Sequence, residues 1–379
     1  MSGLDKLDNS SFSVAFKSHK TPTNPLIDVA RKKQFEKPLH GGDKESVRFA
    51  TPPEPIARYR AQRLRARTLA DISCGIGGQT VFFAQQCEFV YAVEIDSKKI
   101  EYAKQNCAMY GLENVKFICG GDALDPKVIE QIPAVDVVFS DPFRPAEEDK
   151  RQVSSLEPGI PNVLSAYGEK TKNFAFEAPP PQMPPPERIP FDCEKEYISL
   201  DGQLNRLTLY FGDLKQNERL AVALPAGEGL VSQYGPLPEI RETEKMKLFA
   251  YEPEPSVIAA ELLPELIESM MQMAGPLMGA FELFRVDKKR LLITSEALIK
   301  QPMIKNHYLI QKICPFDPRE INKFLKDKNI GNVVLRAGVK PEDYWEVRNE
   351  VEKGLEGNKT VHLFVKDGVA ILCEVLFKV

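Results

Sequence analysis

One eight-residue stretch restricts the possible folds of this chain more than any other. Residues 71–78 read Asp-Ile-Ser-Cys-Gly-Ile-Gly-Gly, between the short apolar run 68–70 and a segment, 79–84, that is typical of a helix start. Glycines let a backbone turn sharply and approach a ligand without interference from a Cβ atom. The free N–H groups of the following helix favour a carboxylate or phosphate group there. The stretch therefore predicts a nucleotide-type binding turn between a strand and a helix.

The spacing of the glycines argues against a dinucleotide. The motif that binds the pyrophosphate of NAD or FAD is G-x-G-x-x-G, and here Thr80 stands in place of the last glycine. A glycine turn also occurs in α/β proteins with other functions, so the turn alone does not decide the function of the chain.

Three further apolar runs end in polar or acidic residues. The run 89–95 contains Glu94, and a carboxylate at this position can accept hydrogen bonds from both hydroxyls of a ribose. The run 115–119 leads to Asp122, and the run 135–139 leads to Ser140 and Asp141. Because the carboxyl ends of parallel strands share one edge of an open α/β sheet, these residues predict a common ligand site at that edge.

Over residues 46–145 the chain resembles class I S-adenosylmethionine-dependent methyltransferases. The motifs that carry the resemblance are Asp71-x-x-Cys74-Gly75-x-Gly77-Gly78, Glu94, Asp122 and Asp141-Pro142-Phe143. The resemblance implies a Rossmann-like α/β sheet and S-adenosylmethionine as the cofactor. It also implies the following contacts: Asp71, Ser73, Cys74, Gly75 and Gly77 at the methionine part, Glu94 at the ribose, and Ile95, Asp122 and Ala123 at the adenine.

The end of the fourth strand supplies candidate catalytic residues. Methyl transfer from a sulfonium is an in-line displacement, so the protein mainly positions donor and acceptor. For an exocyclic amine, Asp141 is predicted to accept the N–H, Pro142 to fix the backbone, and Phe143 to stack on the ring. The series resembles the motif of amine-modifying methyltransferases, although that motif usually has two prolines before the aromatic residue. A register that begins at Ser140 stays open.

Basic residues gather at both ends of the chain. Residues 1–70 hold 14 Lys and Arg against 7 Asp and Glu, residues 285–379 hold 18 against 13, and the middle is acidic. Basic residues at both ends could bind a polyanionic substrate at a distance from the cofactor. An ordinary solvated surface could show the same distribution of charge. In a helix expected near residue 56, three arginines either bind RNA phosphates or solvate one face: Arg58, Arg60 and Arg63.

The entry to this helix carries a second resemblance. Thr51-Pro52 resembles the segment before the glycine turn in trimethylguanosine synthases of RNA caps, which makes Thr51 a candidate cofactor contact. Methylation of a cap guanosine is nevertheless disfavoured, because no Trp follows Pro142 and the chain's single Trp is Trp345.

Composition suggests three segments. Residues 1–45 form a basic extension, and residues 46–285 form the methyltransferase domain, with a proline-rich insertion and hairpin at 156–215. The prolines between 156 and 190 argue against a regular helix or central strand. Asp201-Gly202 predicts the turn of the hairpin. Strands at 219–224, 239–247 and 248–251 are expected to complete the sheet, followed by a helix at 256–273.

Residues 300–379 alternate as strand, helix, strand, helix, strand, strand, which predicts a small α+β domain. The segment resembles THUMP-like domains, and the whole chain resembles methyltransferases that carry such a domain at the C terminus. The resemblance implies RNA binding, with Lys323 and Arg336 as candidate contacts.

Other features restrict compartment and partners. The seven cysteines are scattered and the four histidines are isolated, so we expect reduced thiols in a cytoplasmic protein and no metal site. No run approaches the length of a membrane span, and the N-terminus lacks a signal-peptide pattern, so no membrane partner is expected. The oligomeric state is left open.

Three classes of function remain. The leading hypothesis is an S-adenosylmethionine-dependent methyltransferase acting on an exocyclic amine of a base in RNA, either tRNA or rRNA. The second is a methyltransferase acting on a protein or small metabolite. The third is a non-catalytic RNA-binding protein with a methyltransferase fold, against which the intact Asp71, Glu94 and glycines argue.

Overall fold

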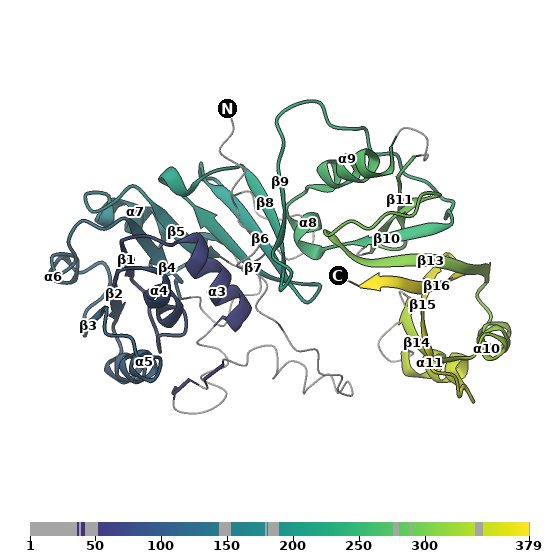
Figure 1. Ribbon diagram of the computed structural model, residues 1–379, viewed down its shortest axis with the longest axis horizontal. Coiled ribbons are helices and arrows are strands. Elements are labelled where there is room, and N and C mark those ends of the chain that lie inside the picture. Colours follow the sequence, from purple (N-terminus) through teal and green to yellow (C-terminus); the bar gives the residue numbers. More distant parts are fainter. Residues whose placement is uncertain are drawn as a thin grey trace. The chain divides into compact units, whose positions relative to one another are not determined.

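The computed structural model describes residues 36–37, 39–41, 52–143, 153–178, 180, 189–275, 280–288, 290–337 and 344–378. The chain divides into two compact units (Figure 1). The first holds the described residues of 1–179, 187–194 and 206–216, and the second holds those of 180–186, 195–205 and 217–379. Within the described residues, no helix is long and apolar enough to cross a membrane.

The first unit alternates strands and helices, as predicted for residues 68–141. Its elements are α3 (Glu54–Arg63), β1 (Thr68–Asp71), α4 (Thr80–Gln86), β2 (Phe89–Glu94), α5 (Ser97–Met109), β3 (Val115–Cys119), α6 (Pro126–Ile129), β4 (Val137–Ser140), η2 (Val153–Ser155), α7 (Ile160–Tyr167), β5 (Phe174–Ala178), the greater part of β7 (Gln203–Tyr210) and η3 (Gly212–Leu214).

The strands of this unit run in the order β3-β2-β1-β4-β5-β7. All neighbouring pairs are parallel except β5 and β7, which are antiparallel. This is the Rossmann-like α/β sheet that the sequence predicts. Because β1 lies between β2 and β4, the carboxyl ends of these three strands are neighbours, and the turn after β1 occupies the centre of that edge.

Helices α3, α4 and α5 pack on the sheet through apolar side chains. Ala57 and Ala61 of α3 share a buried cluster with Phe82 and Phe83 of α4, and Phe139 of β4 belongs to it. A second cluster joins α5 to β2: Ile100, Ala103, Ala92 and Cys74. Full burial of a Phe side chain contributes about 2–3 kcal/mol, so these contacts fix the helices that flank the glycine turn.

The prediction that prolines exclude a helix or central strand between 156 and 190 is wrong. Pro161 stands in the first turn of α7, where a backbone N–H has no intrahelical partner to lose. Strand β5 ends before the proline cluster begins, and it pairs with both β4 and β7 as a wholly buried central strand. The fifth strand of the sheet is therefore β5 rather than residues 219–224, and the antiparallel strand is β7.

The second unit contains the remaining strands, apart from the first residue of β6. Its elements are β6 (Glu194–Leu200, from Lys195 onward), β8 (Arg219–Leu224), β9 (Glu228–Val231), β10 (Phe249–Pro253), α8 (Pro255–Ala259), α9 (Leu263–Ala274), β11 (Glu282–Arg285), β12 (Leu291–Ser295), β13 (Ile304–Pro315), α10 (Pro318–Asp327), β14 (Ile330–Arg336), α11 (Tyr344–Glu352), β15 (Lys359–Lys366) and β16 (Val369–Lys378). Asp201 and Gly202 have φ angles of 50° and 70°, as the predicted turn after β6 requires.

The predicted strand and helix pattern of residues 300–379 is confirmed, and its sheet also includes strands that come earlier in the chain. The seven strands of this sheet run in the order β11-β12-β10-β13-β16-β15-β14. Strand β13 pairs with β10 on one side and β16 on the other, so the sheet begins near residue 249. Strands β10 and β11, which come before residue 286, thus lie in the same sheet as β13.

Two further expectations in this region are wrong. Residues 239–247 form no strand, and Glu242 makes only an isolated bridge to Leu283. The helix expected at 256–273 is divided into α8 and α9. The division has a local cause, because Glu261 adopts a left-handed φ of 56° and α9 begins with a proline in its first turn.

Candidate cofactor and acceptor site

The glycine turn between β1 and α4 needs its glycines. Gly75 and Gly77 have φ angles of 55° and 83°, a region that other residues rarely adopt. A Cβ atom on Gly77 would lie 3.0 Å from the Cα of Ala103 in α5. The turn is therefore strongly bent and held close to α5.

The buried side chain of Asp71 stabilises this turn through hydrogen bonds. Its carboxylate is completely buried and accepts a 2.6 Å hydrogen bond from the Thr80 hydroxyl at the start of α4. The backbone N–H of Ser73 also donates to it, at 3.4 Å. Burial raises the pKa of Asp71 to about 6. Because the carboxylate has no exposed surface, Asp71 shapes the turn and does not itself face a ligand.

The predicted contact of Cys74 is restricted to its backbone. The thiol side chain is 5% exposed and packs with Ala92, Ile100 and Ala103, and burial raises its pKa well above the ordinary value. The backbone N–H of Cys74 donates to the carbonyl of Val93 at 2.9 Å. The residue therefore joins the turn to β2.

Glu94 ends β2 beside the turn, as predicted. One carboxylate oxygen accepts the N–H of Gly75 and the other accepts the N–H of Asp96, both at 3.0 Å. The side chain is only partly buried. Because each carboxylate oxygen can accept two hydrogen bonds, the group keeps acceptor capacity for hydroxyl groups while its position is fixed.

The predicted adenine side lies along the ends of β2 and β3. Ile95 is 63% exposed directly after β2, so its apolar side chain is accessible at this edge of the sheet. Asp122 is exposed after β3, and its carboxylate caps the backbone N–H of Leu124 at 2.8 Å. The carbonyl of Ala123 accepts a 2.7 Å hydrogen bond from the hydroxyl of Tyr167 in α7.

The acceptor residues lie on the other side of the turn, at the end of β4. The backbone N–H of Asp141 donates to the hydroxyl oxygen of Ser73 at 2.5 Å, which ties this strand end to the glycine turn. Pro142 is buried, whereas Phe143 is 68% exposed. The backbone of Phe143 exchanges two hydrogen bonds with Glu157, at 2.7 and 3.0 Å, so the exposed ring is carried by a fixed backbone.

Two of the three arginines predicted as RNA contacts in α3 are engaged inside the first unit. Arg60 is 1% exposed, pairs with Glu177 at 2.8 Å and donates to Gln79 at 3.1 Å. Arg63 pairs with the buried Glu194, and its guanidinium lies 3.8 Å from the centre of the Tyr210 ring. These two side chains hold the first unit together and are not presented to a phosphate backbone.

Arg58 is 43% exposed but is also engaged, because its guanidinium bonds Glu54 at 2.6 Å and Glu36 at 3.0 Å. In the second unit, Lys323 is exposed on α10. Arg336 is partly buried and close enough to Glu252 to affect its ionisation. Burial alone would raise the pKa of Glu252, but Lys305, two hydrogen bonds and Arg336 lower it. Thr51 lies outside the described residues.

Sequence reasoning missed three buried residues at the site. Glu177 is the next-to-last residue of β5 and pairs with both Arg60 and Arg206, the latter at 2.5 Å. Tyr167 reaches the adenine-side loop through its hydroxyl. Asn106 of α5 is wholly buried and bonds the carbonyl of Ile76 in the glycine turn at 2.7 Å. Only Glu177 had a usable sequence signal, an acid in the apolar run Phe-Ala-Phe-Glu-Ala.

The fold places the chain in a known class. A crystal structure of a putative methyltransferase from Porphyromonas gingivalis W83 matches 86% of this chain and 82% of its own, with a TM-score of 0.63 and 15% sequence identity. This likeness and the sheet show the Rossmann-like fold of class I methyltransferases.

Sequence comparisons give narrower matches. Residues 66–156 match the model of a family described as RNA cap guanine-N2 methyltransferase. An uncharacterized S-adenosylmethionine-dependent methyltransferase from Mycobacterium tuberculosis is 28% identical over 178 residues, which cover 46% of this chain and 47% of that protein. An uncharacterized RNA methyltransferase from Clostridium acetobutylicum is 38% identical over 95 residues, covering 25% of this chain and 20% of that protein. The chain thus matches about half or less of the length of these curated relatives.

Proposed function

We propose that the chain is an S-adenosylmethionine-dependent methyltransferase that modifies an exocyclic amine of a base in RNA. The observation that carries the proposal is the 2.5 Å hydrogen bond between Ser73 and the backbone of Asp141. It joins the turn that receives the cofactor to the strand end that receives the acceptor. The family match over residues 66–156 and the relative named as an RNA methyltransferase support this proposal.

The cofactor side of the site binds by shape and by hydrogen bonding. Glu94 accepts the ribose hydroxyls, Ile95 packs on the adenine, and the backbone of residues 73–77 encloses the methionine part. When bound, S-adenosylmethionine supplies an electrophilic methyl group. The ends of β1, β2 and β3 therefore hold the donor in one orientation, which is the main contribution a protein makes to an in-line displacement.

The acceptor side orients the amine. The Asp141 side chain accepts the amine N–H and directs the nitrogen lone pair toward the donor, while Pro142 fixes the backbone that carries it. The exposed Phe143 ring offers a face on which a base stacks, an interaction of about 1–3 kcal/mol. The family description makes N2 of guanine the first amine to test.

RNA docking is assigned to the second unit. The resemblance of residues 300–379 to THUMP-like domains supports this assignment, as does the exposed basic residue Lys323 on α10. Arg60 and Arg63 are excluded from it by their internal ion pairs.

Incubation of the protein with total RNA and isotope-labelled S-adenosylmethionine, followed by mass spectrometry of the nucleosides, tests the proposal. Labelled N-methylated nucleosides are expected. Label in protein or small metabolites, with none in RNA, would support the second class of function. Absence of cofactor binding in calorimetry would overturn the enzyme assignment.

The role of Asp141 is tested separately. In Asp141→Ala the backbone N–H that bonds Ser73 remains, so cofactor affinity should stay unchanged while turnover falls by orders of magnitude. Asp141→Asn keeps an acceptor oxygen and should lose less. Glu88→Ala, a change of an exposed carboxylate at the amino end of β2, is the control. Near-normal turnover of Asp141→Ala would show that this strand end is only structural.

A further inference from the structure

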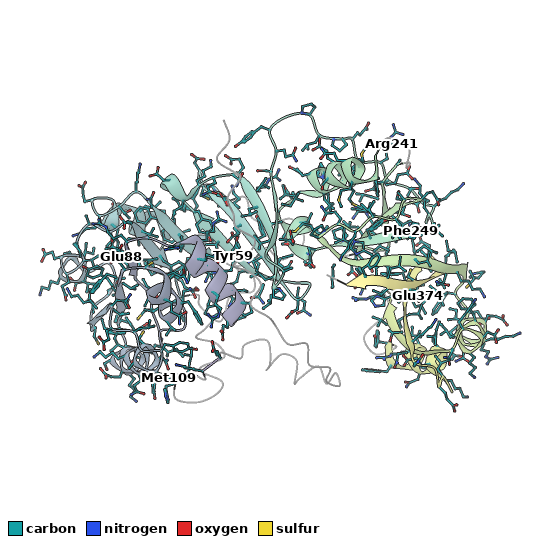
Figure 2. The ribbon with its side chains drawn as sticks, in the orientation of Figure 1. Tyr59, Glu88, Met109, Arg241, Phe249 and Glu374 are labelled. Atoms are coloured by element: carbon teal, nitrogen blue, oxygen red, sulfur yellow. The ribbon has the colours of Figure 1, made fainter. Side chains whose placement is uncertain are left out.

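A short segment from before α3 lies against the first unit. The described residues 36–37 and 39–41, here called the strap, contact α3 and α5. At one end, the N–H of Glu36 donates to Glu54 at 2.6 Å, and its carboxylate bonds Arg58 at 3.0 Å. In the middle, the Lys37 ammonium donates at 3.0 Å to the carbonyl of Met109. Met109 is the last residue of α5 and is labelled in Figure 2.

The far end of the strap is held by a single buried amide. The side-chain oxygen of Asn106 accepts the backbone N–H of His40 at 2.7 Å, and the side-chain nitrogen donates to the carbonyl of His40 at 2.9 Å. The same nitrogen donates to the carbonyl of Ile76, in the glycine turn, at 2.7 Å. Asn106 is completely buried, so the loss of any of these bonds leaves a polar group without water.

Helix α5 holds the same part of the turn by packing. Ala103 lies one helical turn before Asn106 and touches the backbone at Gly77 so closely that a Cβ there would meet it at 3.0 Å. Residues 76 and 77 are thus fixed from one side, by a close contact and a hydrogen bond from the same helix. A shift of the Asn106 amide moves both the strap and the turn.

We propose that Asn106 is a positioning residue that couples docking of the strap to binding of the cofactor. The inference rests on the proposed cofactor site, because its effect passes through the turn at Ile76. With the strap docked, both hydrogens of the amide are held by carbonyls and the turn keeps the shape that receives S-adenosylmethionine. Without the strap, His40 no longer fixes the amide, and the bond to Ile76 loosens.

The strap is suited to such coupling because most of the interactions that hold it are polar and are exposed or only partly buried. Among its described residues, only Leu39 is buried in the core, at 9% exposure. A segment held by one apolar side chain and by hydrogen bonds that are partly exposed to water has a small local docking free energy. A bound ligand can shift an equilibrium of that size, and by linkage the strap must then strengthen cofactor binding by the same factor.

The test compares two substitutions of the same residue in the full-length protein. His40→Pro removes the N–H that donates to Asn106, whereas His40→Ala keeps it and serves as the matched control. Calorimetric titration with S-adenosylmethionine should show affinity about 5- to 10-fold weaker for His40→Pro, the value of about one hydrogen bond. His40→Ala should bind like wild type. In steady-state assays the loss should lie in KM for the cofactor, with kcat nearly unchanged.

Hydrogen exchange supplies the reciprocal readout. Adding S-adenosylhomocysteine to the wild-type protein should slow exchange of the His40 amide, and Asn106→Ala should abolish this protection. Two outcomes would overturn the inference and leave the enzyme assignment intact. One is equal cofactor affinity of His40→Pro and His40→Ala, and the other is an exchange rate of the His40 amide that does not change when the ligand is added. Failure of the wild-type protein to bind either ligand overturns both.

Discussion

At the scale of single residues, the buried carboxylate of Asp71 makes stability depend on pH. Its pKa is raised to about 6 by burial, against about 3.9 in an unfolded chain. Between these values the folded state binds more protons, so the free energy of unfolding falls as pH rises. The contribution is fully present below about pH 4 and is lost above about pH 6.

Asp71→Asn should remove this dependence. The decline in the free energy of unfolding of the first unit between about pH 4 and 7 should shrink by about 3 kcal/mol, the equivalent of about two pKa units. Urea unfolding at a series of pH values measures it. Asp122→Asn, a change of an exposed carboxylate, is the control. Parallel pH profiles for wild type and Asp71→Asn would show that Asp71 does not titrate in this range.

Glu94 is a second residue whose role can be tested through its bonds. Glu94→Ala removes the acceptor of the Gly75 N–H and the predicted ribose bonds, each worth about 1.5–3 kcal/mol when charge-assisted. Calorimetry should therefore show cofactor affinity at least tenfold lower. Glu101→Ala, which removes an exposed carboxylate paired with Lys104 on α5, should bind normally. Unchanged affinity of Glu94→Ala would remove Glu94 from the site.

At the scale of elements, α3 is a structural helix with a basic sequence. Arg60→Ala leaves Glu177 buried with one partner fewer, and loss of one partner of a buried ion pair costs about 3–5 kcal/mol. Arg58→Ala removes a half-exposed pair and should cost about 1 kcal/mol or less. Denaturant unfolding of the two variants measures the difference. Equal stabilities would show that the buried pair contributes no more to stability than the half-exposed one.

The contrast between α3 and the strand ends shows which elements are predictable. Residues 71–78, Glu94, Asp122 and Asp141 come directly after or close to short apolar runs, so their place at one sheet edge could be derived from local pattern alone. The burial of Arg60 could not, because its partner Glu177 lies more than a hundred residues away and in a strand hidden by neighbouring prolines. Local composition indicates charge but not the partner of that charge.

The sequence also did not reveal which strands share a sheet. The sequence predicts strands at 219–224 and 248–251 at about the right places, yet β8 is not the fifth strand of its sheet and β10 lies in the other sheet. Strand formation depends on local side chains, whereas pairing depends on contacts between residues far apart in the chain. The Asn106 amide belongs to the same category, because its partners His40 and Ile76 come from separate segments.

At the scale of the whole molecule, the basic residues near the two ends of the chain have different roles. Part of the positive charge near the N-terminus is used inside the first unit by Arg60 and Arg63. The charge of α10 and of the residue directly after it is exposed and lies in the second unit: Lys323, Lys326 and Lys328. These lysines are exposed, whereas Arg60 and Arg63 are engaged in ion pairs inside the first unit. The lysines are therefore the better candidates for contacts with the phosphates of an RNA substrate.

The last prediction concerns this basic group. Simultaneous substitution of Lys323, Lys326 and Lys328 by Glu should weaken RNA binding while leaving S-adenosylmethionine affinity unchanged. Phosphate contacts release counterions, so the slope of log affinity against log salt should become flatter by about two for a single-stranded RNA, at about 0.7 for each of three contacts. Fluorescence anisotropy with labelled RNA at several salt concentrations measures both quantities. A matched control reverses three exposed lysines of the first unit, Lys104, Lys127 and Lys172, with the same change in net charge. Equal losses in the two triple variants would mean that RNA responds only to the overall charge, and the second unit would then lose its assignment as the docking surface.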